Sequence, residues 1–146
     1  FRRVLFRSCD RRPGSCVVCA RAECVGLAFR VTTTTGRTVA TCCPRCGLHY
    51  LETNRLEARH LEATDFGSGK WIAATQAVFV EDSDVAACAH PATRRDEQGC
   101  CYLTTYDRCL PTLVAFHDSA AARAFQADHG GTLVSWAQLQ RNQQKP

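Results

Sequence analysis

The chain has 146 residues, a length that suits one domain or two very small ones. Hydrophobic residues make up 45% and charged residues 22%, which excludes a disordered protein, and no apolar run approaches the roughly 18 residues of a membrane-spanning helix. Cysteine is the unusual component, with 11 residues against no methionine; because an odd number cannot all pair within one chain, metal binding is the first function to consider.

The first eight residues, Phe1–Ser8, read as a translated sequencing adapter, and we expect them to be an artefact outside the fold. They include Arg2, Arg3 and Arg7, so leaving them out lowers the formal net charge from +4 to +1. That balance does not indicate a nucleic-acid partner. On this interpretation, any export signal is missing from the chain, and attachment to a membrane would come only through a lost N-terminal anchor.

An α+β fold of two small ββαβ-like units is predicted, the first over residues 9–66. Val25, Leu27, Phe29 and Val31 alternate with smaller or polar residues, which is typical of a strand with one buried face. In chain order, we expect a strand over 23–35, a strand over 38–42, a helix over 45–54 and a strand over 57–64.

The second unit is predicted over 67–140 and repeats this order. We expect a strand over 75–81, a cysteine-rich loop over 82–110, a strand over 112–116, a helix from Asp118 or Ser119 to Gly130, a strand over 132–136, and a polar tail over 141–146. Each unit has only about 60 residues, too few to bury a comfortable core alone. Bound metal would supply the missing stability.

Two cysteine pairs in the first unit give the strongest chemical signal. Cys16 and Cys19 form one C-x2-C pair, and Cys43 and Cys46 form a second, of the C-P-x-C-G form. Two thiolates on one tight turn can reach the same tetrahedral ion, so the four cysteines predict a structural zinc site of treble-clef-like or zinc-ribbon-like form. Cys42 competes with Cys43, since C-x3-C is also a ligand spacing. The alternative is two disulfides in an exported protein.

A looser group of cysteines and one histidine lies in the second unit. Its members are Cys88, His90, Cys100, Cys101 and Cys109. Thiolates with one imidazole suit Cu(I) or zinc. Adjacent side chains on extended backbone point to opposite sides, so one of Cys100 and Cys101 is expected to be a ligand. The alternative is a loop tied by disulfides such as Cys88 to Cys109, while Cys9 and Cys24 stay unassigned.

No catalytic motif accompanies these cysteines. The chain has no G-x-S-x-G, no phosphate-binding glycine loop and no H-E-x-x-H, and its acidic residues form no convincing catalytic pair. We therefore expect a protein that is not an enzyme.

Several segments resemble NosL-type proteins, the copper-binding accessory factors of nitrous oxide reductase. They are Gly67–Ile72 with Ala77–Val80, and Leu113–Phe116, Ala121–Phe125 and His129–Trp136 near the end. The resemblance covers roughly residues 16 to 140. It implies a fold of two related ββαβ units, Cu(I) binding, and an exported lipoprotein on the periplasmic side of the cell envelope.

This chain differs from the family pattern around its first cysteine pair. Family members typically carry a Cys-x-x-Cys-Gly-Met-like stretch and further methionines, whereas Cys19 here is followed by Ala20 and Arg21. The pair Cys43 and Cys46 is an addition that resembles heavy-metal-associated treble-clef modules.

These observations together predict a NosL-like accessory protein that binds metal. In this hypothesis the four-cysteine site holds structural zinc, and the looser site takes Cu(I) and passes it to a metal-receiving protein partner. One alternative is a zinc-stabilised interaction or metal-sensor module with purely structural cysteines. Another is a disulfide-tied exported protein without metal.

Overall fold

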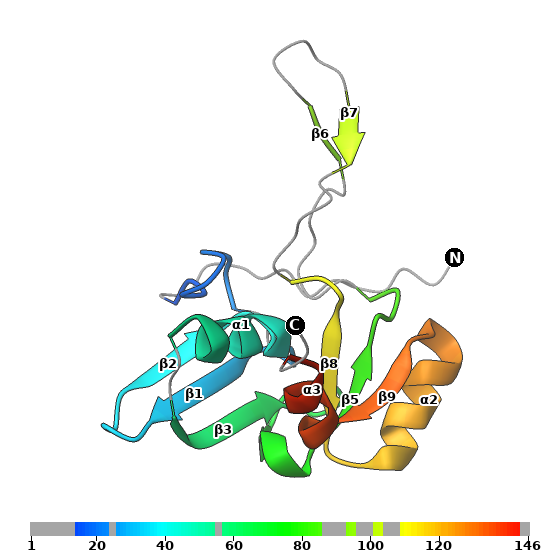
Figure 1. Ribbon diagram of the computed structural model, residues 1–146. Helices are drawn as coiled ribbons and strands as arrows, with labels where there is room; N and C mark the ends of the chain where they lie inside the picture. Colours follow the sequence, from blue (N-terminus) through cyan, green and yellow to red (C-terminus); the bar gives the residue numbers. More distant parts are fainter. Residues whose placement is uncertain are drawn as a thin grey trace.

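Two small antiparallel sheets that carry helices make up most of the structure, a computed structural model (Figure 1). It describes residues 14–23, 26–54, 57–85, 93–95, 101–103 and 109–143. The expected artefact Phe1–Ser8 lies outside these residues, as do Cys9 and Cys24. Within these ranges, no helix combines the length and the apolar character needed to cross a membrane.

The elements follow one another in the order that the sequence predicts. The first half contains β1 (Phe29–Thr33), β2 (Thr38–Thr41), α1 (Pro44–Asn54), β3 (Ala58–Thr64), β4 (Trp71–Ala73) and the 3-10 turn η1 (Ala74–Gln76). The second half contains β5 (Val78–Glu81), β6 (Thr93–Arg95), β7 (Cys101–Leu103), β8 (Leu113–Phe116), α2 (Ser119–His129), β9 (Thr132–Ser135) and α3 (Trp136–Gln143). The order β1-β2-α1-β3 returns as β5-β8-α2-β9, so the predicted α+β fold of two ββαβ-like units is confirmed.

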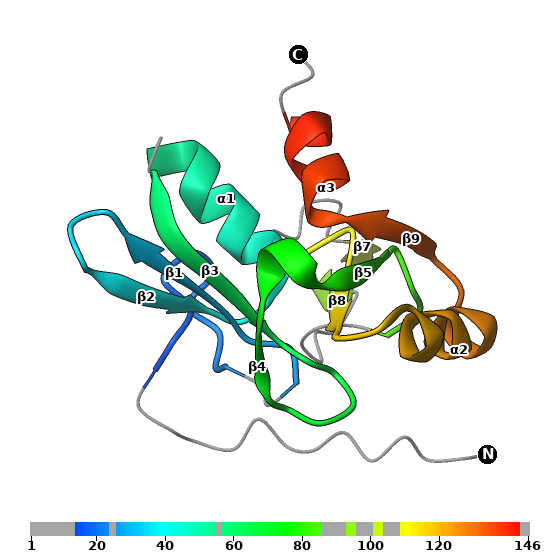
Figure 2. The same ribbon diagram turned by 90° about the horizontal axis from the view of Figure 1, so that it is seen from below.

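The first sheet has the strand order β2-β1-β3-β4, and every neighbouring pair is antiparallel. Phe29 and Val31 are fully buried on one face of β1, where Leu48 of α1 packs against them (Figure 2). Gly47 lets α1 approach this face closely, because a Cβ atom built on Gly47 would lie 2.2 Å from the ring of Phe29. The absence of a side chain at Gly47 therefore sets the position of α1 on the sheet.

The second sheet has the order β8-β5-β9, again antiparallel. α2 covers it with Phe125, which packs against Phe116 of β8 at a ring-centroid distance of 5.0 Å. The Asp118 side chain caps this helix by accepting a hydrogen bond from the Ala121 N–H at 2.7 Å. Gly130, with φ of 71°, ends it.

The two sheets share one hydrophobic core, and a second, separate cluster lies between the second sheet and α2. Phe29 and Leu48 from the first half lie in the same cluster as Phe79, Leu113 and Trp136 from the second half. Trp136 stacks on Phe29 at 5.6 Å and touches Phe79 at 6.0 Å, and α3, which starts at this tryptophan, lies between the two sheets (Figure 1). Each unit was expected to have too few residues for a comfortable core of its own. In the structure, packing between the two units provides burial that neither unit would have alone.

The structure corrects the end of the chain. A strand over 132–136 and a polar tail from 141 were expected, but the helix α3 starts at Trp136. Ser135 and Gln138 explain the change: the Ser135 hydroxyl accepts from the Gln138 N–H at 3.2 Å, and the Gln138 side chain accepts from the Ser135 N–H at 2.7 Å. This reciprocal pair is a capping box, which starts a helix where the alternation of apolar residues indicates a strand.

The strands differ from the prediction in four other places. β1 begins at Phe29 and not at residue 23, and β5 begins at Val78 because η1 occupies the three residues 74–76. β4 lies beyond residue 66 yet pairs with β3 in the first sheet. Within the expected loop over 82–110, β6 and β7 pair with each other.

Candidate metal centre

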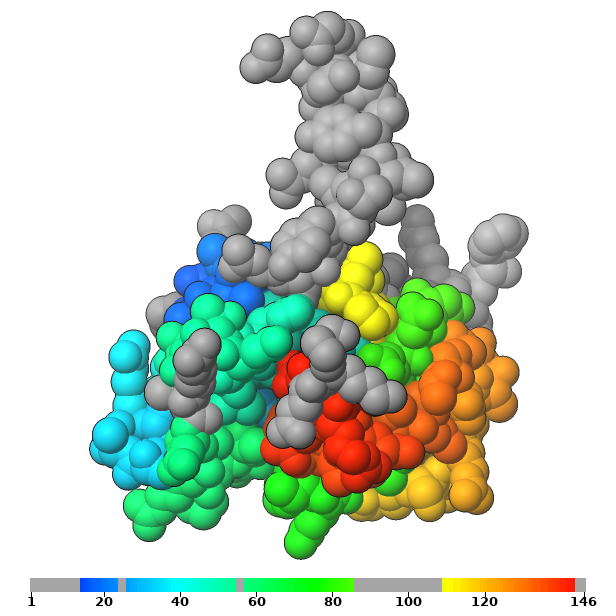
Figure 3. All heavy atoms as spheres, in the orientation of Figure 1, coloured from blue at the N-terminus to red at the C-terminus, as the bar shows by residue number. Residues whose placement is uncertain are grey.

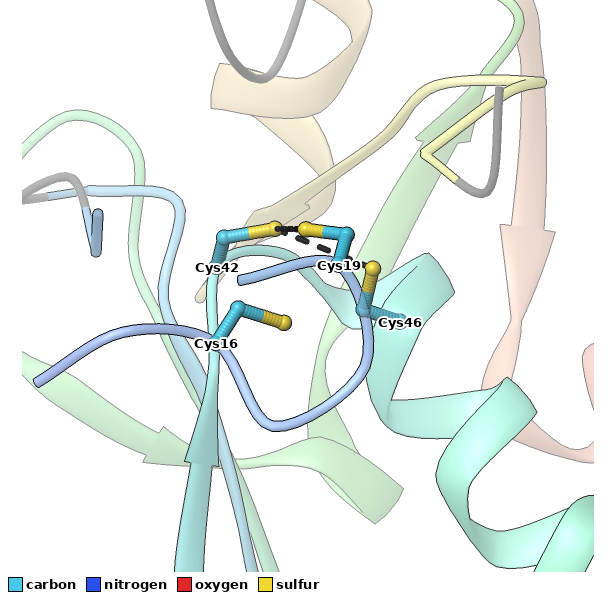
Figure 4. Close-up of side chains that lie close together, drawn as sticks. All are labelled: Cys16, Cys19, Cys42 and Cys46. Atoms are coloured by element: carbon cyan, nitrogen blue, oxygen red, sulfur yellow. Dashed lines mark hydrogen bonds between the residues drawn. The ribbon is translucent and has the colours of Figure 1, made fainter. Parts of the chain in front are cut away.

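Six cysteine side chains converge where three segments of the chain meet. They are Cys16, Cys19, Cys42, Cys43, Cys46 and Cys109, and we call them the thiol cluster. Cys19 is partly exposed and the other five are buried. Figure 4 shows the sulfur atoms of four of them directed toward one another.

The first segment is a closed turn around Cys16 and Cys19. The Cys16 N–H donates to the Arg21 carbonyl at 2.7 Å, and the Ala20 N–H donates to the Cys16 carbonyl at 2.8 Å. Ala20 has φ of 60°, the left-handed conformation that this tight turn requires. The Val18 N–H points at the Cys16 sulfur at 3.4 Å, which favours a thiolate there.

The second segment runs from the end of β2 into the first turn of α1. The Thr41 hydroxyl donates to the carbonyls of Phe29 and Cys43, at 3.3 and 3.0 Å, and so fixes the link between strand and helix. Cys42 and Cys43 lie in this link, and Cys46 lies in the first turn of α1. A helix N-terminus favours negative charge, so this position suits thiolates.

The third segment is the short stretch that leads into β8, and it brings Cys109 to the cluster. The Arg45 side chain holds this segment against α1, donating to the Pro111 carbonyl at 2.8 Å and pairing with Glu81 of β5. The Arg21 guanidinium donates to the Cys109 sulfur at 3.1 Å. Figure 3 shows the blue residues of the first segment and the yellow residues that lead into β8 on the same side of the molecule.

The sulfur positions fit a metal centre. A tetrahedral ion with Zn–S bonds of about 2.3 Å holds its sulfur atoms about 3.8 Å apart. The Cys42 sulfur lies 3.4 Å from Cys19, 3.8 Å from Cys43, 3.7 Å from Cys46 and 3.6 Å from Cys109. Because a disulfide bond is about 2.0 Å long, these contacts are between unbonded thiols.

Crowding changes the acidity of the thiols. Burial raises the pKa of Cys19 to about 11, and hydrogen bonding with Cys109 raises the pKa of both Cys42 and Cys46 above the ordinary range. The pKa of Cys16 is lowered, because the thiols of Cys42 and Cys46 donate hydrogen bonds to its sulfur. An incoming metal ion has to displace the protons of the thiols whose pKa is raised.

The predicted four-cysteine set is brought together with one change of arrangement. Cys16, Cys19 and Cys46 form a group of four with Cys42, the residue that competes with Cys43 in the sequence. Cys43 lies in a second group, with Cys42, Cys46 and Cys109. The structure thus answers the choice between Cys42 and Cys43 by placing both in the cluster.

Cys109 lies elsewhere than expected. The sequence grouped it with the looser site of the second unit, but its sulfur is 3.6 Å from that of Cys42 and 3.7 Å from that of Cys46. The physical reason is the return of the chain from its cysteine-rich loop into β8, which runs beside the start of α1. Cys88, the expected disulfide partner of Cys109, lies outside the described residues.

The other candidates of the looser site are not among the side chains that the structure describes. Cys88, His90 and Cys100 lie outside the described residues, and Cys101 opens β7 with a side chain that is also outside them. Arg21 was missed by the sequence reasoning. A lone arginine two residues after a C-x2-C pair carries no signal until the fold brings Cys109 to it.

Comparisons with known proteins agree with this architecture. No protein-family model and no curated protein matches the chain. Among solved structures, the crystal structure of the copper chaperone NosL from Shewanella denitrificans is similar, with a TM-score of 0.62 at 16% sequence identity, over 87% of this chain and 90% of that one. The predicted resemblance is thereby confirmed for the fold: this chain has a NosL-like α+β fold, with a cysteine cluster in its N-terminal half that fits a metal site.

Proposed function

We propose that this chain is a metal-binding accessory protein that carries copper and has no catalysis of its own. The observation that supports the proposal is the thiol cluster, six cysteine side chains gathered on a NosL-like fold. A buried group of cysteines without a disulfide is unusual unless the thiols have a ligand or a chemical role.

The chemistry of the donors favours a soft metal ion. The groups of four that could hold an ion contain sulfur donors only, without a carboxylate or an imidazole. Thiolates select Cu(I) and zinc over magnesium, calcium or manganese, which prefer oxygen. Copper is the proposed cargo because the similar solved structure is titled a copper chaperone.

A carrier has to exchange its ligands with those of a partner. Cys19 is the one partly exposed thiol of the cluster, so an incoming thiolate of the partner would meet the metal there first. Cys109 is part of the cluster and is also the last cysteine of the loop that carries Cys88, Cys100 and Cys101. We propose that these three cysteines and His90 are the looser ligands that transfer the metal. In keeping with the family resemblance of its sequence, we propose that the protein works on the periplasmic side of the cell envelope.

Competition for Cu(I) tests the proposal. The reduced full chain is titrated with Cu(I) in the presence of a chromophoric Cu(I) chelator, beside the variant Cys46→Ser and a variant with Cys88, Cys100 and Cys101 all replaced by serine. We expect Cys46→Ser to weaken Cu(I) binding at least tenfold. The loop variant should bind Cu(I) but release it more slowly to an added thiol ligand. Failure of the wild-type chain to compete for Cu(I), or full affinity in Cys46→Ser, would overturn the proposal.

Burial supports a second candidate, a zinc-stabilised interaction module. Five of the six thiols are buried, and their spacing suits a closed tetrahedral zinc site as well as it suits copper. Elemental analysis of protein purified without added metal separates the two. If Cu(I) supplied in a chelator buffer cannot displace the bound zinc, the protein is the structural module. If Cu(I) does displace the zinc, the protein is the carrier.

A further inference from the structure

We propose that the thiol cluster holds two metal ions in a single centre, with Cys42 and Cys46 each bound to both ions. This inference rests on the proposed function, since it requires that the cluster binds metal. It adds the number of ions, the identity of the bridging ligands, and a division of the remaining cysteines into two outer pairs.

The sulfur atoms fall into two overlapping groups of four. One group is Cys16, Cys19, Cys42 and Cys46, the other is Cys42, Cys43, Cys46 and Cys109, and within each group all sulfur atoms lie within 4.8 Å of one another. Cys42 and Cys46 belong to both groups, and their sulfur atoms are 3.7 Å apart. Two tetrahedra that share one edge have two such overlapping groups, with the shared edge between the bridging sulfurs. The sulfurs of Cys19 and Cys109, which belong to different outer pairs, are 3.9 Å apart here, so loading both ions would move them apart.

The number of thiols matches two ions and not one. A single tetrahedral ion takes four sulfur ligands and would leave two of the six thiols of the cluster without metal. Two four-ligand shells that share two ligands use six thiols in all. Cys16 with Cys19, and Cys43 with Cys109, are then the outer pairs of the two ions.

The proposed bridging residues lie on the best-fixed part of the site. Cys42 and Cys46 belong to one short segment, held between β2 and α1 by the hydrogen bonds of the Thr41 hydroxyl. The outer pair of Cys16 and Cys19 comes from a separate closed turn. Because the bridging residues Cys42 and Cys46 are fixed and the outer pair lies on another segment, an ion can bind or leave without a change in the positions of the two bridging sulfurs.

Charge compensation is present on the outer side of the second group. Two divalent ions with six thiolates keep a net negative charge, which costs free energy in a buried place. The Arg21 guanidinium lies 3.1 Å from the Cys109 sulfur, and the first turn of α1 adds the positive end of its dipole beside Cys43. On binding, each thiol passes its proton to solvent and forms its metal bonds through sulfur, without any change of oxidation state.

Cadmium NMR tests the shared edge directly. The reduced wild-type chain is loaded with ¹¹³Cd²⁺, a thiophilic ion that accepts tetrahedral sulfur coordination, and the one-dimensional and correlation spectra are recorded. Two ¹¹³Cd nuclei that share bridging sulfurs are expected to give two resonances that split each other. Two resonances without mutual splitting, or one resonance, would overturn the two-ion centre while leaving the proposed function intact. No bound cadmium and no bound Cu(I) would overturn both.

Matched variants locate the bridge. Cys9→Ser, which removes a thiol that is not one of the six, should keep the coupled pair, and losing it there would overturn the assignment to the cluster. Cys43→Ser removes an outer ligand and should weaken one ion at least tenfold, leaving the other unchanged. Cys42→Ser, at the neighbouring and equally buried position, should weaken both ions at least tenfold. Weakening of only one ion in Cys42→Ser would overturn its bridging role; if that variant does not fold, the wild-type coupling still decides.

Discussion

Replacing Gly47 with alanine tests how the fold positions the cluster. A Cβ atom at this position would lie 2.2 Å from the Phe29 ring, whereas carbon atoms in contact are normally about 3.5 to 4.0 Å apart. Relieving this clash requires α1 to lift from the first sheet by more than about 1 Å, and overpacking of this severity costs about 3 kcal/mol. Alanine returns about 1 kcal/mol through its higher helix propensity. The expected net loss is about 2 kcal/mol of unfolding free energy, or about 6 °C in melting temperature.

Urea unfolding of the metal-free chain measures this loss. Gly67→Ala is the matched control, because the atom nearest to a Cβ at Gly67 is an Asp65 carboxylate oxygen at 3.5 Å, an ordinary contact. Since Cys46 directly precedes Gly47, lifting α1 should also weaken cadmium binding in Gly47→Ala and not in the control. If Gly47→Ala is as stable as the wild type, or more stable, the proposed packing of α1 on Phe29 is wrong.

Two further variants address charge. The carboxylate of Asp65 is buried and accepts hydrogen bonds from the Ser68 hydroxyl at 2.7 Å, the His117 N–H at 2.9 Å and the Ser68 N–H at 2.8 Å. Burial raises the pKa of Asp65, but these bonds, the hydroxyl first, outweigh burial and hold the pKa below its usual range. Its stabilisation is therefore present above about pH 4, the unfolded value, and is lost as the pH falls toward the folded pKa. Asp65→Asn should cost about 1 to 3 kcal/mol at pH 7 and flatten the acid limb of the melting temperature against pH; an unchanged profile would contradict this. Arg21→Gln should weaken cadmium binding about tenfold by removing the charged donor to Cys109, whereas Arg21→Lys, which keeps the charge, should weaken it less; equal affinity in Arg21→Gln would contradict this.

The local patterns of the sequence predict most of the fold. Alternating apolar residues identify β1, Pro44 starts α1, and Asp118 with Gly130 encloses α2. These signals act between residues close in the chain, where sterics and capping hydrogen bonds decide the conformation. The start of α3 was missed because Ser135 and Gln138 form a capping box inside a segment that also alternates like a strand.

The site was less predictable because its arrangement depends on contacts between distant residues. The spacing of Cys16 with Cys19, and of Cys43 with Cys46, gives two local pairs but not the neighbours of each pair. Cys109 is 63 residues after Cys46, and nothing in its local sequence tells which end of which sheet it reaches. Nothing in the C-P-x-C-G spacing indicates that Gly47, the glycine after Cys46, allows α1 to approach Phe29.

The connection of the thiol cluster to both sheets decides what metal removal should do. Cys42 and Cys46 adjoin β2 and α1 of the first sheet, while Cys109 leads into β8 of the second, so bound metal would crosslink the two halves at this junction. The shared core of Phe29, Phe79 and Trp136 needs no metal for its contacts. We therefore expect removal of metal by a chelator under reducing conditions to expose the closed turn at 14–23 and the approach to β8, while the central strands stay folded. Amide hydrogen exchange measures this: β1 and β5 should keep their slowest protons, with protection lost mainly around the cysteines. Loss of protection throughout both sheets would show that metal supports the whole fold, and that the shared core is insufficient without it.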